Sequence, residues 1–451
     1  MQKINNYLAA LVLSSICYLT YEYTGNKFIF FLFSIVANLT VYYFFKKKQS
    51  FFGLYMSIFL WLGMWVKMAL AIVCFPSFFN VNTTIIDKAL IISTLAFLAL
   101  NIAIYYQRII ALHIKGCCHR PTSSLSFFYK NNRCKILLTF FILYSLIALI
   151  NLRMHIYQRG LVSEYILPMH FNSVIKFLFL FGFPVVGSYL LFFDCNHKKK
   201  PYLVSMLLIL EGFFSSISIL SRGFIFNISS IIFGLVNFWG NIKYKKKFLC
   251  FISIVILASF VISLKIVNSL RAQEFHLESA QPTKSLFSES STNLDFFYAR
   301  WVGIEEIILV AKKNDLNFDL FKESLNESSD QRRQSFFDYN FAPERYSNVD
   351  WSKNSFISTP GVVAFLFYPG SYIFLVTGLF ITFFVISLLE ILANIYGGGN
   401  IIFNSLICQI IAFRMAHFGY SPLNSCLFFI SILSIILLIN LSNKLASKLH
   451  P

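Results

Sequence analysis

The sequence is poor in charged side chains. Only 13% of its 451 residues are Asp, Glu, Lys or Arg, and 57% are hydrophobic, whereas soluble domains have roughly 25% charged and 45–50% apolar residues. So few polar side chains could not cover a water-exposed surface on a chain of this length. The composition excludes a soluble globular protein, and the mean hydropathy of +0.67 favours a protein that faces lipid.

The sequence also lacks the motifs of several enzyme classes. Its nine cysteines are scattered without a CxxC spacing, and there is no P-loop, GxGxxG, HExxH or GxSxG pattern. These absences exclude a nucleotide-driven or serine-hydrolase mechanism of the usual kind. We expect neither a metal site nor a disulfide framework, and no cofactor.

Long apolar runs are what the chain has instead. A spanning helix needs ~20 mainly apolar residues, because each residue rises about 1.5 Å through a ~30 Å hydrocarbon layer. We therefore predict an all-α polytopic membrane protein with about twelve transmembrane helices. The predicted spans are 6–24, 28–45, 51–75, 87–107, 136–151, 172–193, 202–220, 224–240, 248–267, 371–395, 400–418 and 424–443.

Basic residues gather in short clusters between these runs. They lie at 46–48, 108–135, 198–200 and 243–247, and all four clusters fall on one side of the membrane if the amino terminus is inside. Because Lys and Arg in short loops stay cytoplasmic, we predict that both termini are cytoplasmic. The net charge of +18 thus reflects membrane topology, and we expect no nucleic-acid partner.

One long connection interrupts the pattern and lies outside in this orientation. It holds 14 of the 20 acidic residues against 5 Lys and 5 Arg, and we expect it to be folded. The predicted organisation is spans 1–9 in 1–267, the extracytoplasmic loop in 268–358, and spans 10–12 in 359–451.

Periodicity predicts the structure inside the loop. Residues 293–313 have apolar side chains at helical spacing, which indicates an amphipathic helix with one apolar face against the membrane domain. Residues 328–350 are polar and non-periodic, so we expect irregular loop there. Residues 356–369 return toward the bilayer, and we expect a short interfacial helix in them.

Arginine is mainly an outside residue in this topology. Guanidinium groups bind phosphate bidentately and stay charged when partly desolvated, so the bias predicts a phosphate or diphosphate ligand in the outer leaflet. Nine of the twelve arginines are assigned outward: Arg153, Arg159, Arg222, Arg271, Arg300, Arg332, Arg333, Arg345 and Arg414.

The case for a binding role differs among these cations. Arg222 stands in a tight outer turn between two apolar helices, with no acid nearby in sequence, and an unpaired cation there is costly unless an anion meets it. Arg414 and His417, beside Tyr420, could bind the same anion or pack against lipid headgroups. Lys176 at an outer helix end could snorkel to the interface.

Other charged residues have structural alternatives. Arg332, Arg333 and Arg345 lie among loop acids and favour solvated ion pairs. Glu211 and Glu390 lie within predicted spans; a proton or ion path is one interpretation, and a structural brace is the one we favour.

For chemistry, the outer helix offers Arg300 followed by Glu305 and Glu306. A glycosyl transfer from a lipid diphosphate needs a stabiliser for the departing phosphates and a carboxylate or His base for the acceptor hydroxyl. Arg300 and Glu305 suit these roles, although the same residues also fit an ordinary charged helix face.

Two segments resemble a known family. Leu220–Phe224 (LSRGF) and Gly361–Gly378 are similar to the Ser-Arg-Gly turn and the Gly-punctuated return helix of the Wzy family of bacterial O-antigen repeat-unit polymerases, as is the arrangement of many spans with one late outer loop. The resemblance implies a C-class-like glycosyltransferase of the bacterial inner membrane. It would act without metal and polymerise undecaprenyl-diphosphate-linked oligosaccharides.

The resemblance also implies roles for particular residues. The phosphate-binding arginine carries over to Arg222 and the loop arginine to Arg300 or Arg271. The related ligases have a His before the return helix, where this chain has Ser358 and Thr359, which favours a polymerase and leaves the base unassigned.

The predicted substrate-binding set adds the remaining outer residues, Arg159, Arg414, His417 and Tyr420. Predicted partners are the lipid-linked oligosaccharide, the bilayer and, as a candidate, a chain-length-regulating co-polymerase. A flippase for the same lipid-linked oligosaccharide and a non-catalytic membrane scaffold are the alternative functions.

Overall fold

The structure, a computed structural model, describes residues 2–47, 50–74, 81–114, 123–161, 167–168, 171–197, 201–221, 223–239, 245–274, 301–327, 334–343 and 358–449. Within these ranges eight helices are long and apolar enough to cross a membrane, and four shorter apolar helices coincide with four further predicted spans. The prediction of an all-helical, multi-pass membrane protein is confirmed.

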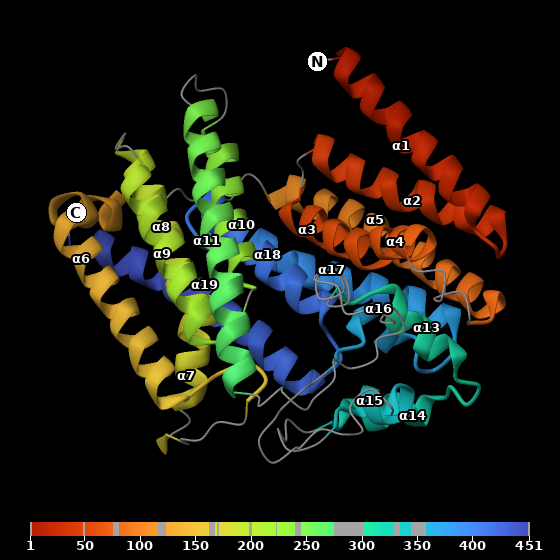
Figure 1. The fold of residues 1–451 in the computed structure, drawn as a ribbon. Coiled ribbons are helices and arrows are strands. Elements are labelled where there is room, and N and C mark those ends of the chain that lie inside the picture. The colour runs from red at the N-terminus through yellow and green to blue at the C-terminus, as the bar shows by residue number, and fades with distance from the viewer. Residues whose placement is uncertain are drawn as a thin grey trace.

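The amino-terminal part forms one side of the bundle (Figure 1). Its third span is continuous but contains a π-helical turn, η1, and such turns widen a helix locally. Its elements are α1 (Gln2–Glu22), α2 (Lys27–Lys47), α3 (Phe51–Leu60), η1 (Trp61–Val66), α4 (Lys67–Cys74) and α5 (Thr83–Ile114).

The middle of the chain forms the other side, where α9 packs on α6, α10 and α11. A second π-helical turn, η5, joins α7 to α8. The elements are α6 (Ser123–Met154), α7 (Phe171–Phe177), η5 (Leu178–Gly182), α8 (Phe183–Asn196), α9 (Tyr202–Ser218), α10 (Phe224–Phe238) and α11 (Lys245–Glu274).

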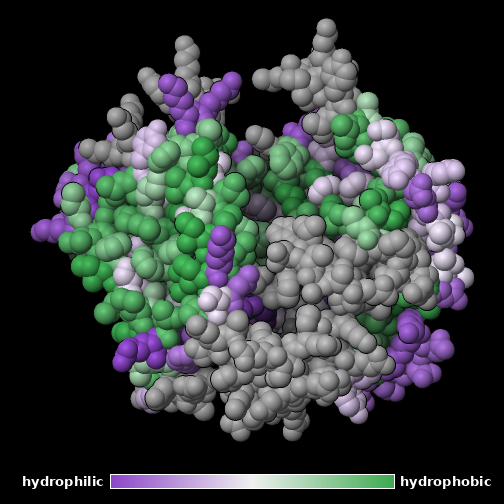
Figure 2. All heavy atoms as spheres, viewed as in Figure 1, coloured by the Kyte–Doolittle hydropathy of each residue, from purple (hydrophilic) through white to green (hydrophobic). Residues whose placement is uncertain are grey.

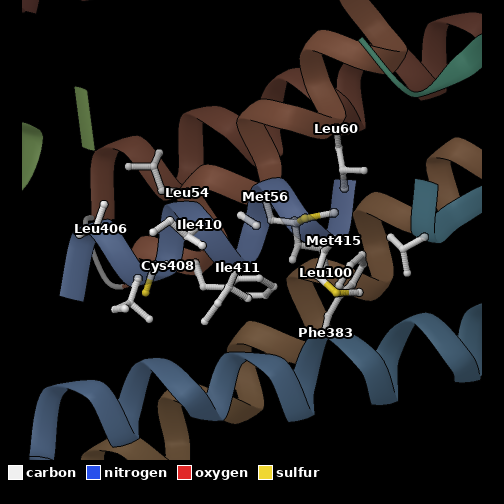
Figure 3. Close-up of a cluster of buried hydrophobic side chains, with 14 of the residues drawn as sticks. Leu54, Met56, Leu60, Leu100, Phe383, Leu406, Cys408, Ile410, Ile411 and Met415 are labelled. Carbon is white, nitrogen blue, oxygen red and sulfur yellow. The ribbon is translucent and has the colours of Figure 1, made fainter. Parts of the chain in front are cut away.

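The last three helices, α17 (Tyr372–Tyr396), α18 (Ile401–Ala416) and α19 (Pro422–Leu449), join these two sides. Helix α18 packs on α3 on one side and on α10 on the other, while α17 lies along α5 and α19 contacts α6. Figure 3 shows the resulting core, in which α18 side chains such as Ile411 and Met415 meet Leu54 and Leu60 of α3 and Phe383 of α17. All five side chains are buried, so α18 is the central helix of the bundle.

The outer surface is apolar where lipid would contact it. Figure 2 shows hydrophobic side chains over the side of the bundle formed by α6, α9 and α11, with hydrophilic ones gathered toward both ends of these helices. Leu257 of α11 is 62% exposed and Leu438 of α19 is 59% exposed. Such exposure of large apolar side chains on a helix surface is stable in hydrocarbon and unfavourable in water.

Four short helices lie in and after the predicted outer loop: α13 (Ile304–Lys312), α14 (Phe318–Leu325), α15 (Phe336–Phe341) and α16 (Gly361–Leu366). We call the end of the bundle that carries α13–α15 the loop end; it is at the bottom in Figure 1. The helix predicted within 356–369 is confirmed as α16, although its residues are buried and do not lie at a surface.

One prediction for this region holds in part and another was wrong. Helix α13 lies within the helix predicted at 293–313 and packs on α5, but it is buried on nearly all sides, including Glu305 and Glu306; the first part of the predicted helix lies outside the described residues. The expected irregular loop contains α15, because Ser335 caps the helix by accepting a hydrogen bond from the Asp338 amide at 3.0 Å. A six-residue helix is too short to produce a readable period.

Helix α13 is attached to the third span at two points. Gly63 of η1 and Gly303 touch through their backbones, because a Cβ on Gly63 would lie 2.1 Å from the carbonyl oxygen of Val302. One turn further on, Lys67 Nζ lies 2.9 Å from Glu305 Oε2 and donates to the Trp301 carbonyl oxygen at 2.9 Å. Both charged side chains are at most 1% exposed, so the pair is fully desolvated.

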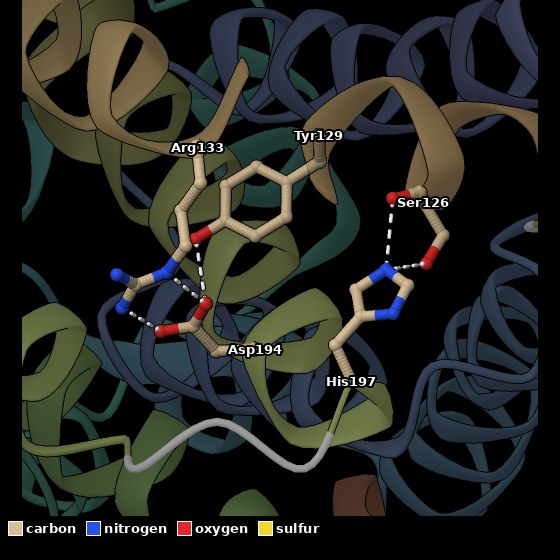
Figure 4. Close-up of polar contacts among 5 residues, drawn as sticks. All are labelled: Ser126, Tyr129, Arg133, Asp194 and His197. Atoms are coloured by element: carbon tan, nitrogen blue, oxygen red, sulfur yellow. Dashed lines mark hydrogen bonds and ion pairs between the residues drawn. The ribbon is translucent and has the colours of Figure 1, made fainter. Parts of the chain in front are cut away.

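A second ion pair, between the partly exposed Arg133 and the buried Asp194, holds the opposite end of the bundle. Arg133 of α6 donates from Nε and Nη2 to the two oxygens of Asp194 on α8, at 2.7 and 2.8 Å, and the Tyr129 hydroxyl adds a third bond (Figure 4). Beside it, His197 contacts Ser126. The fork-to-fork geometry fixes α6 against α8.

The two acids of the predicted spans also have structural partners. Glu211 accepts a hydrogen bond from the Ser215 hydroxyl at 2.9 Å. Glu390 accepts from the Ser50 hydroxyl at 2.6 Å and from the Phe51 amide at 2.7 Å, so it ties α17 to the start of α3. The brace that we favoured for both residues agrees with these contacts.

Removing one member of the Lys67–Glu305 pair should destabilise the fold. Lys67→Met leaves a carboxylate buried without its counter-charge, and we expect a loss of about 3–5 kcal/mol in the free energy of unfolding. The double variant Lys67→Met/Glu305→Met should recover most of that loss. Denaturant unfolding in detergent micelles measures both; equal stability of Lys67→Met and the wild type would contradict the buried pair.

Candidate functional site

The turn after α9 carries the Ser-Arg-Gly segment. The helix ends because Leu220 adopts a left-handed conformation (φ 55°) and the Ser221 amide bonds back to the Ser216 carbonyl at 2.9 Å, which is the usual pattern of a helix terminus. Arg222 itself lies outside the described residues. Its neighbours Ser221 and Gly223 are described, so the surroundings of the turn can be analysed.

A second turn, after α6, is attached to the first. The buried Asn151 donates from Nδ2 to the Ser218 carbonyl at 2.9 Å and accepts from the Tyr157 amide at 2.9 Å. The Arg159 amide donates to the Ile219 carbonyl, also at 2.9 Å. These bonds join the ends of α6 and α9 and place Tyr157 and Arg159 beside the Ser-Arg-Gly turn.

Arg271 supports the same turn from α11. Its Nε donates to the Leu220 carbonyl oxygen at 3.0 Å, and Nη2 donates to the same oxygen. The guanidinium thus satisfies a carbonyl at the end of α9. We had predicted that Arg271 binds substrate; the structure gives it a role in holding the backbone of the turn.

Gly223 marks where the two turns meet α18. A Cβ on this residue would lie 3.8 Å from Arg159 Nη1 and 4.0 Å from a ring carbon of Phe413. The Ser-Arg-Gly turn therefore lies close both to the Arg159 guanidinium and to the last turns of α18. Residues far apart in sequence, from α6, α9 and α18, meet at this point.

Helix α18 brings two of the predicted residues to this meeting point. Arg414 donates from Nη2 to the Ser425 hydroxyl at 2.9 Å, and its guanidinium lies 5.8 Å from the Phe428 ring centre. The buried Arg414 Nε has no hydrogen-bond partner among the described residues. His417 stacks on Phe413, with ring centres 4.3 Å apart, and contacts its carbonyl through Nδ1.

Tyr157 lies at the centre of three cations, Arg159, Lys176 and Arg414, which we call the cation cluster. Lys176 Nζ is 5.3 Å from the Tyr157 ring centre, and Arg159 hydrogen-bonds the hydroxyl. Burial raises the pKa of the Tyr157 hydroxyl, but Lys176, Arg159 and Arg414 together outweigh burial and bring the pKa below its ordinary value. The charges of all three side chains therefore act on one oxygen.

The cation cluster has no counter-charge among the described residues. The ion pairs of that part of the chain are Lys67–Glu305, Arg133–Asp194 and Lys322–Asp319, and none involves Arg159, Lys176 or Arg414. Lys176 is exposed, whereas Arg159 and Arg414 are partly buried, and like charges that act on one hydroxyl also repel one another. The arrangement is suited to an anion with several oxygens, such as a phosphate or diphosphate.

The described residues contain no group of three or more His, Cys, Asp or Glu side chains that could hold a metal ion. The chemical groups at the site are thus the cation cluster, the Tyr157 hydroxyl and the His417 ring. His417 lies near Arg159 and Arg414, since both cations act on it electrostatically. An imidazole next to an anion-binding site can accept or donate a proton.

The remaining predicted residues lie differently. Glu305 is in the buried pair with Lys67 and would have to leave it to reach any substrate. Arg300 lies outside the described residues, directly before Trp301. Of the residues predicted to bind substrate, Arg159, Arg414 and His417 come together, and Tyr420 follows them in the turn between α18 and α19.

Sequence reasoning missed Glu327, which attaches the outer loop to that turn. Its Oε2 accepts from the Ser421 amide at 3.0 Å and its Oε1 from the Phe336 amide at 2.6 Å. Burial raises the pKa of Glu327, although the two amide hydrogen bonds act in the opposite direction. Glu327 lies in a polar segment that has no helical or strand periodicity, so the sequence did not distinguish it from solvent-exposed acids. Its position holds α15 over the end of α18.

The hydroxyl of Tyr157 provides a direct readout of the cation cluster. The absorbance of tyrosinate is measured during an alkaline titration of the wild type and of Tyr157→Phe. The difference between the two curves should show one tyrosine that ionises below the ordinary pKa of about 10. Arg159→Gln should raise that pKa, because burial then opposes ionisation with one cation fewer. Added inorganic diphosphate should raise it too, since phenolate and anion compete for the same charges. A difference titration with no step below pH 10 would contradict the cluster.

Known proteins provide no guide to this site. Comparison of the chain with protein-family models, with curated proteins and with solved structures finds no match. The functional assignment rests on the residues and their geometry.

Proposed function

We propose that this protein is an oligosaccharide repeat-unit polymerase of the bacterial inner membrane. In this proposal twelve helices span the bilayer, both termini are cytoplasmic, and the loop end faces outward. The basic runs support the orientation, because Lys245, Lys246 and Lys247 begin α11 at the end opposite the loop, where the positive-inside rule places the cytoplasm.

The observation that carries the proposal is the convergence of Arg159, Lys176 and Arg414 on Tyr157 without a described carboxylate. An undecaprenyl diphosphate has an apolar chain that partitions into the bilayer and a doubly phosphorylated head at the membrane surface. Cations at the end of a lipid-embedded bundle match that distribution of charge. We include Arg222 in the site, because Ser221 and Gly223 flank the cluster, and Arg300 as a further candidate.

The reaction we propose is a glycosyl transfer between two lipid-linked glycans. The bond from the anomeric carbon to the diphosphate oxygen breaks, the acceptor hydroxyl oxygen bonds to that carbon, and the diphosphate leaves on its lipid. The cation cluster stabilises the negative charge that develops on the leaving group. The acceptor proton needs a base; burial lowers the pKa of His417 to about 4, which makes its ring a weak base, so the base stays unassigned.

The assignment of Glu305 changes in this scheme. A carboxylate whose charge is already neutralised by Lys67 at 2.9 Å is a weak base and is held away from solvent. We therefore propose that Glu305 positions α13, and through it the preceding loop residues, instead of touching substrate. Tyr420 and Trp301 remain candidates for stacking on sugar faces.

A flippase is the alternative that one observation favours. A cavity of about 390 Å³ opens at the end opposite the loop, as expected for a transport path. However, its described lining has one carboxylate, Glu390, and no Lys or Arg. A diphosphate headgroup would be repelled there, so the cavity is poorly suited to this substrate.

Replacing members of the cation cluster should abolish polymer formation. In cells that depend on the variant, Arg159→Ala, Arg414→Ala or Arg222→Ala should reduce polymer by about 10²-fold or more and leave single-repeat product. Arg414→Lys should retain part of the activity, because charge remains but the bidentate geometry is lost. Arg153→Ala, an exposed arginine at the end of α6, is the matched control. A normal polymer ladder at normal protein abundance in Arg159→Ala and Arg414→Ala would refute the site.

Polymerase and flippase differ in which membrane face must supply the substrate. The purified protein is reconstituted into proteoliposomes in one known orientation, and lipid-linked repeats are supplied at the face that carries the loop end. The wild type should polymerise them, and Arg159→Ala should not. If the protein is a flippase, substrate supplied at the outer face does not need it, and neither the wild type nor the variant should form polymer in this system. Incorporation of radiolabelled repeats into long chains distinguishes the two outcomes.

A further inference from the structure

The cavity at the end opposite the loop is a mainly apolar chamber with a few polar groups, lined by five helices. Leu54 comes from α3 and Ser50 is its N-cap, Gln107 and Ala111 come from α5, and further lining residues come from α10, α17 and α18. Its volume of about 390 Å³ is enough for a small ligand or a lipid headgroup. The cavity is separate from the cation cluster, which lies at the other ends of these helices.

Two buried amides face this chamber without partners in the described protein. Gln107 is 4% exposed and Asn404 is 6% exposed, and both line the cavity. Neither side-chain NH₂ group donates to another described residue, and Asn404 Oδ1 receives only a weak contact from the Cys408 thiol at 3.9 Å. Buried amides of this kind normally have hydrogen-bond partners, so the chamber has donors and acceptors available for a ligand.

Among the described lining residues of the chamber, the one charged side chain is the carboxylate of Glu390. Glu390 accepts three hydrogen bonds, from the Ser50 hydroxyl and the Phe51 and Phe52 amides, and a carboxylate has about four acceptor sites. Helices α5, α10 and α17 end at the chamber, and helix carboxyl ends carry partial negative charge. Helices α3 and α18 begin there, but Glu390 and Asn400 already cap them. The balance favours a cation.

We propose that this chamber binds the primary ammonium group of a small headgroup. An ammonium has three N–H donors and no acceptor, which matches the free site on Glu390 and the amide oxygens of Gln107 and Asn404. The walls between the polar groups are apolar, including Phe51, Ile391 and Ile401, so they suit a ligand that is partly hydrocarbon.

The source we favour is an aminophospholipid of the adjacent leaflet. Phe45, near the end of α2, packs on the lining residue Phe233 with ring centres 6.5 Å apart, and Lys46 follows it with Nζ 5.4 Å from the Tyr42 ring. Glu390 inside the chamber would bind the ammonium of phosphatidylethanolamine, and Lys46, on the adjoining end of α2, is the candidate for its phosphate. A free amine could supply the same ammonium, and the experiment separates the two.

The test uses the purified full-length protein and native mass spectrometry. After equal loading with phosphatidylethanolamine, phosphatidylcholine and phosphatidylglycerol, we expect phosphatidylethanolamine to be retained about tenfold more than the other two. Gln107→Leu and Asn404→Leu, which keep volume and remove hydrogen bonds, should each reduce that retention severalfold. Asn196→Leu, an exposed amide at the same end on α8, should not.

Ethanolamine and spermidine, added at millimolar concentration, form the second arm. Displacement of phosphatidylethanolamine by the free amines supports the ammonium site, and amine binding without any lipid preference assigns the site to free amines. Equal retention of the three lipids together with no amine binding would overturn the proposal. Retention that is unchanged in both leucine variants at wild-type thermal stability would also overturn it. Neither result bears on the cation cluster, because the variants do not touch it.

Discussion

The gathering of Arg159, Lys176 and Arg414 at the loop end, with no ion pair to a described carboxylate, is the constraint on which the proposed site depends. Two other described cations are paired: Lys67 has Glu305 at 2.9 Å and Arg133 has Asp194 at 2.7 Å. Arg271 satisfies a backbone carbonyl, whereas Arg159 and Arg414 contact the Tyr157 hydroxyl, the Ser425 hydroxyl and an aromatic ring. A partly desolvated charge without a described counter-charge favours an external anion, which distinguishes a binding site from a structural ion pair.

The surrounding fold keeps those charges in place. Asn151 joins the ends of α6 and α9, Arg271 holds the Leu220 carbonyl, and the Arg159 amide bonds to the Ile219 carbonyl. Each of these contacts satisfies backbone polar groups that helix ends leave open, so one set of bonds both terminates the helices and positions the cations. A site held by backbone bonds from several helices requires little rearrangement when charge develops in a transition state.

The sequence allowed the helices to be predicted more fully than the site. Membrane spans can be predicted because the hydropathy of ~20 consecutive residues is a local property of the sequence. Arg159, Arg414 and His417 were each assigned to the outer side from the predicted topology. Their meeting around Tyr157 depends on contacts between α6, α7 and α18, which no local pattern contains. The Lys67–Glu305 pair explains the opposite error: Glu305 looked available for chemistry because its partner is far away in sequence. Glu327 was indistinguishable from solvated loop acids for the same reason.

The two sites at the ends of the bundle present different charges, and this difference bears on function. Arg159, Lys176 and Arg414 gather at the loop end, whereas the described lining of the chamber at the other end has one carboxylate, Glu390, and no Lys or Arg. Basic residues of that end, such as Lys246 and Lys247 of α11, are not among the described lining residues. A transporter of an anionic lipid needs cations along its path, whereas a polymerase needs to hold its diphosphates only at the loop end. The cation cluster and the chamber lining together therefore favour a reaction at one membrane face over passage between two.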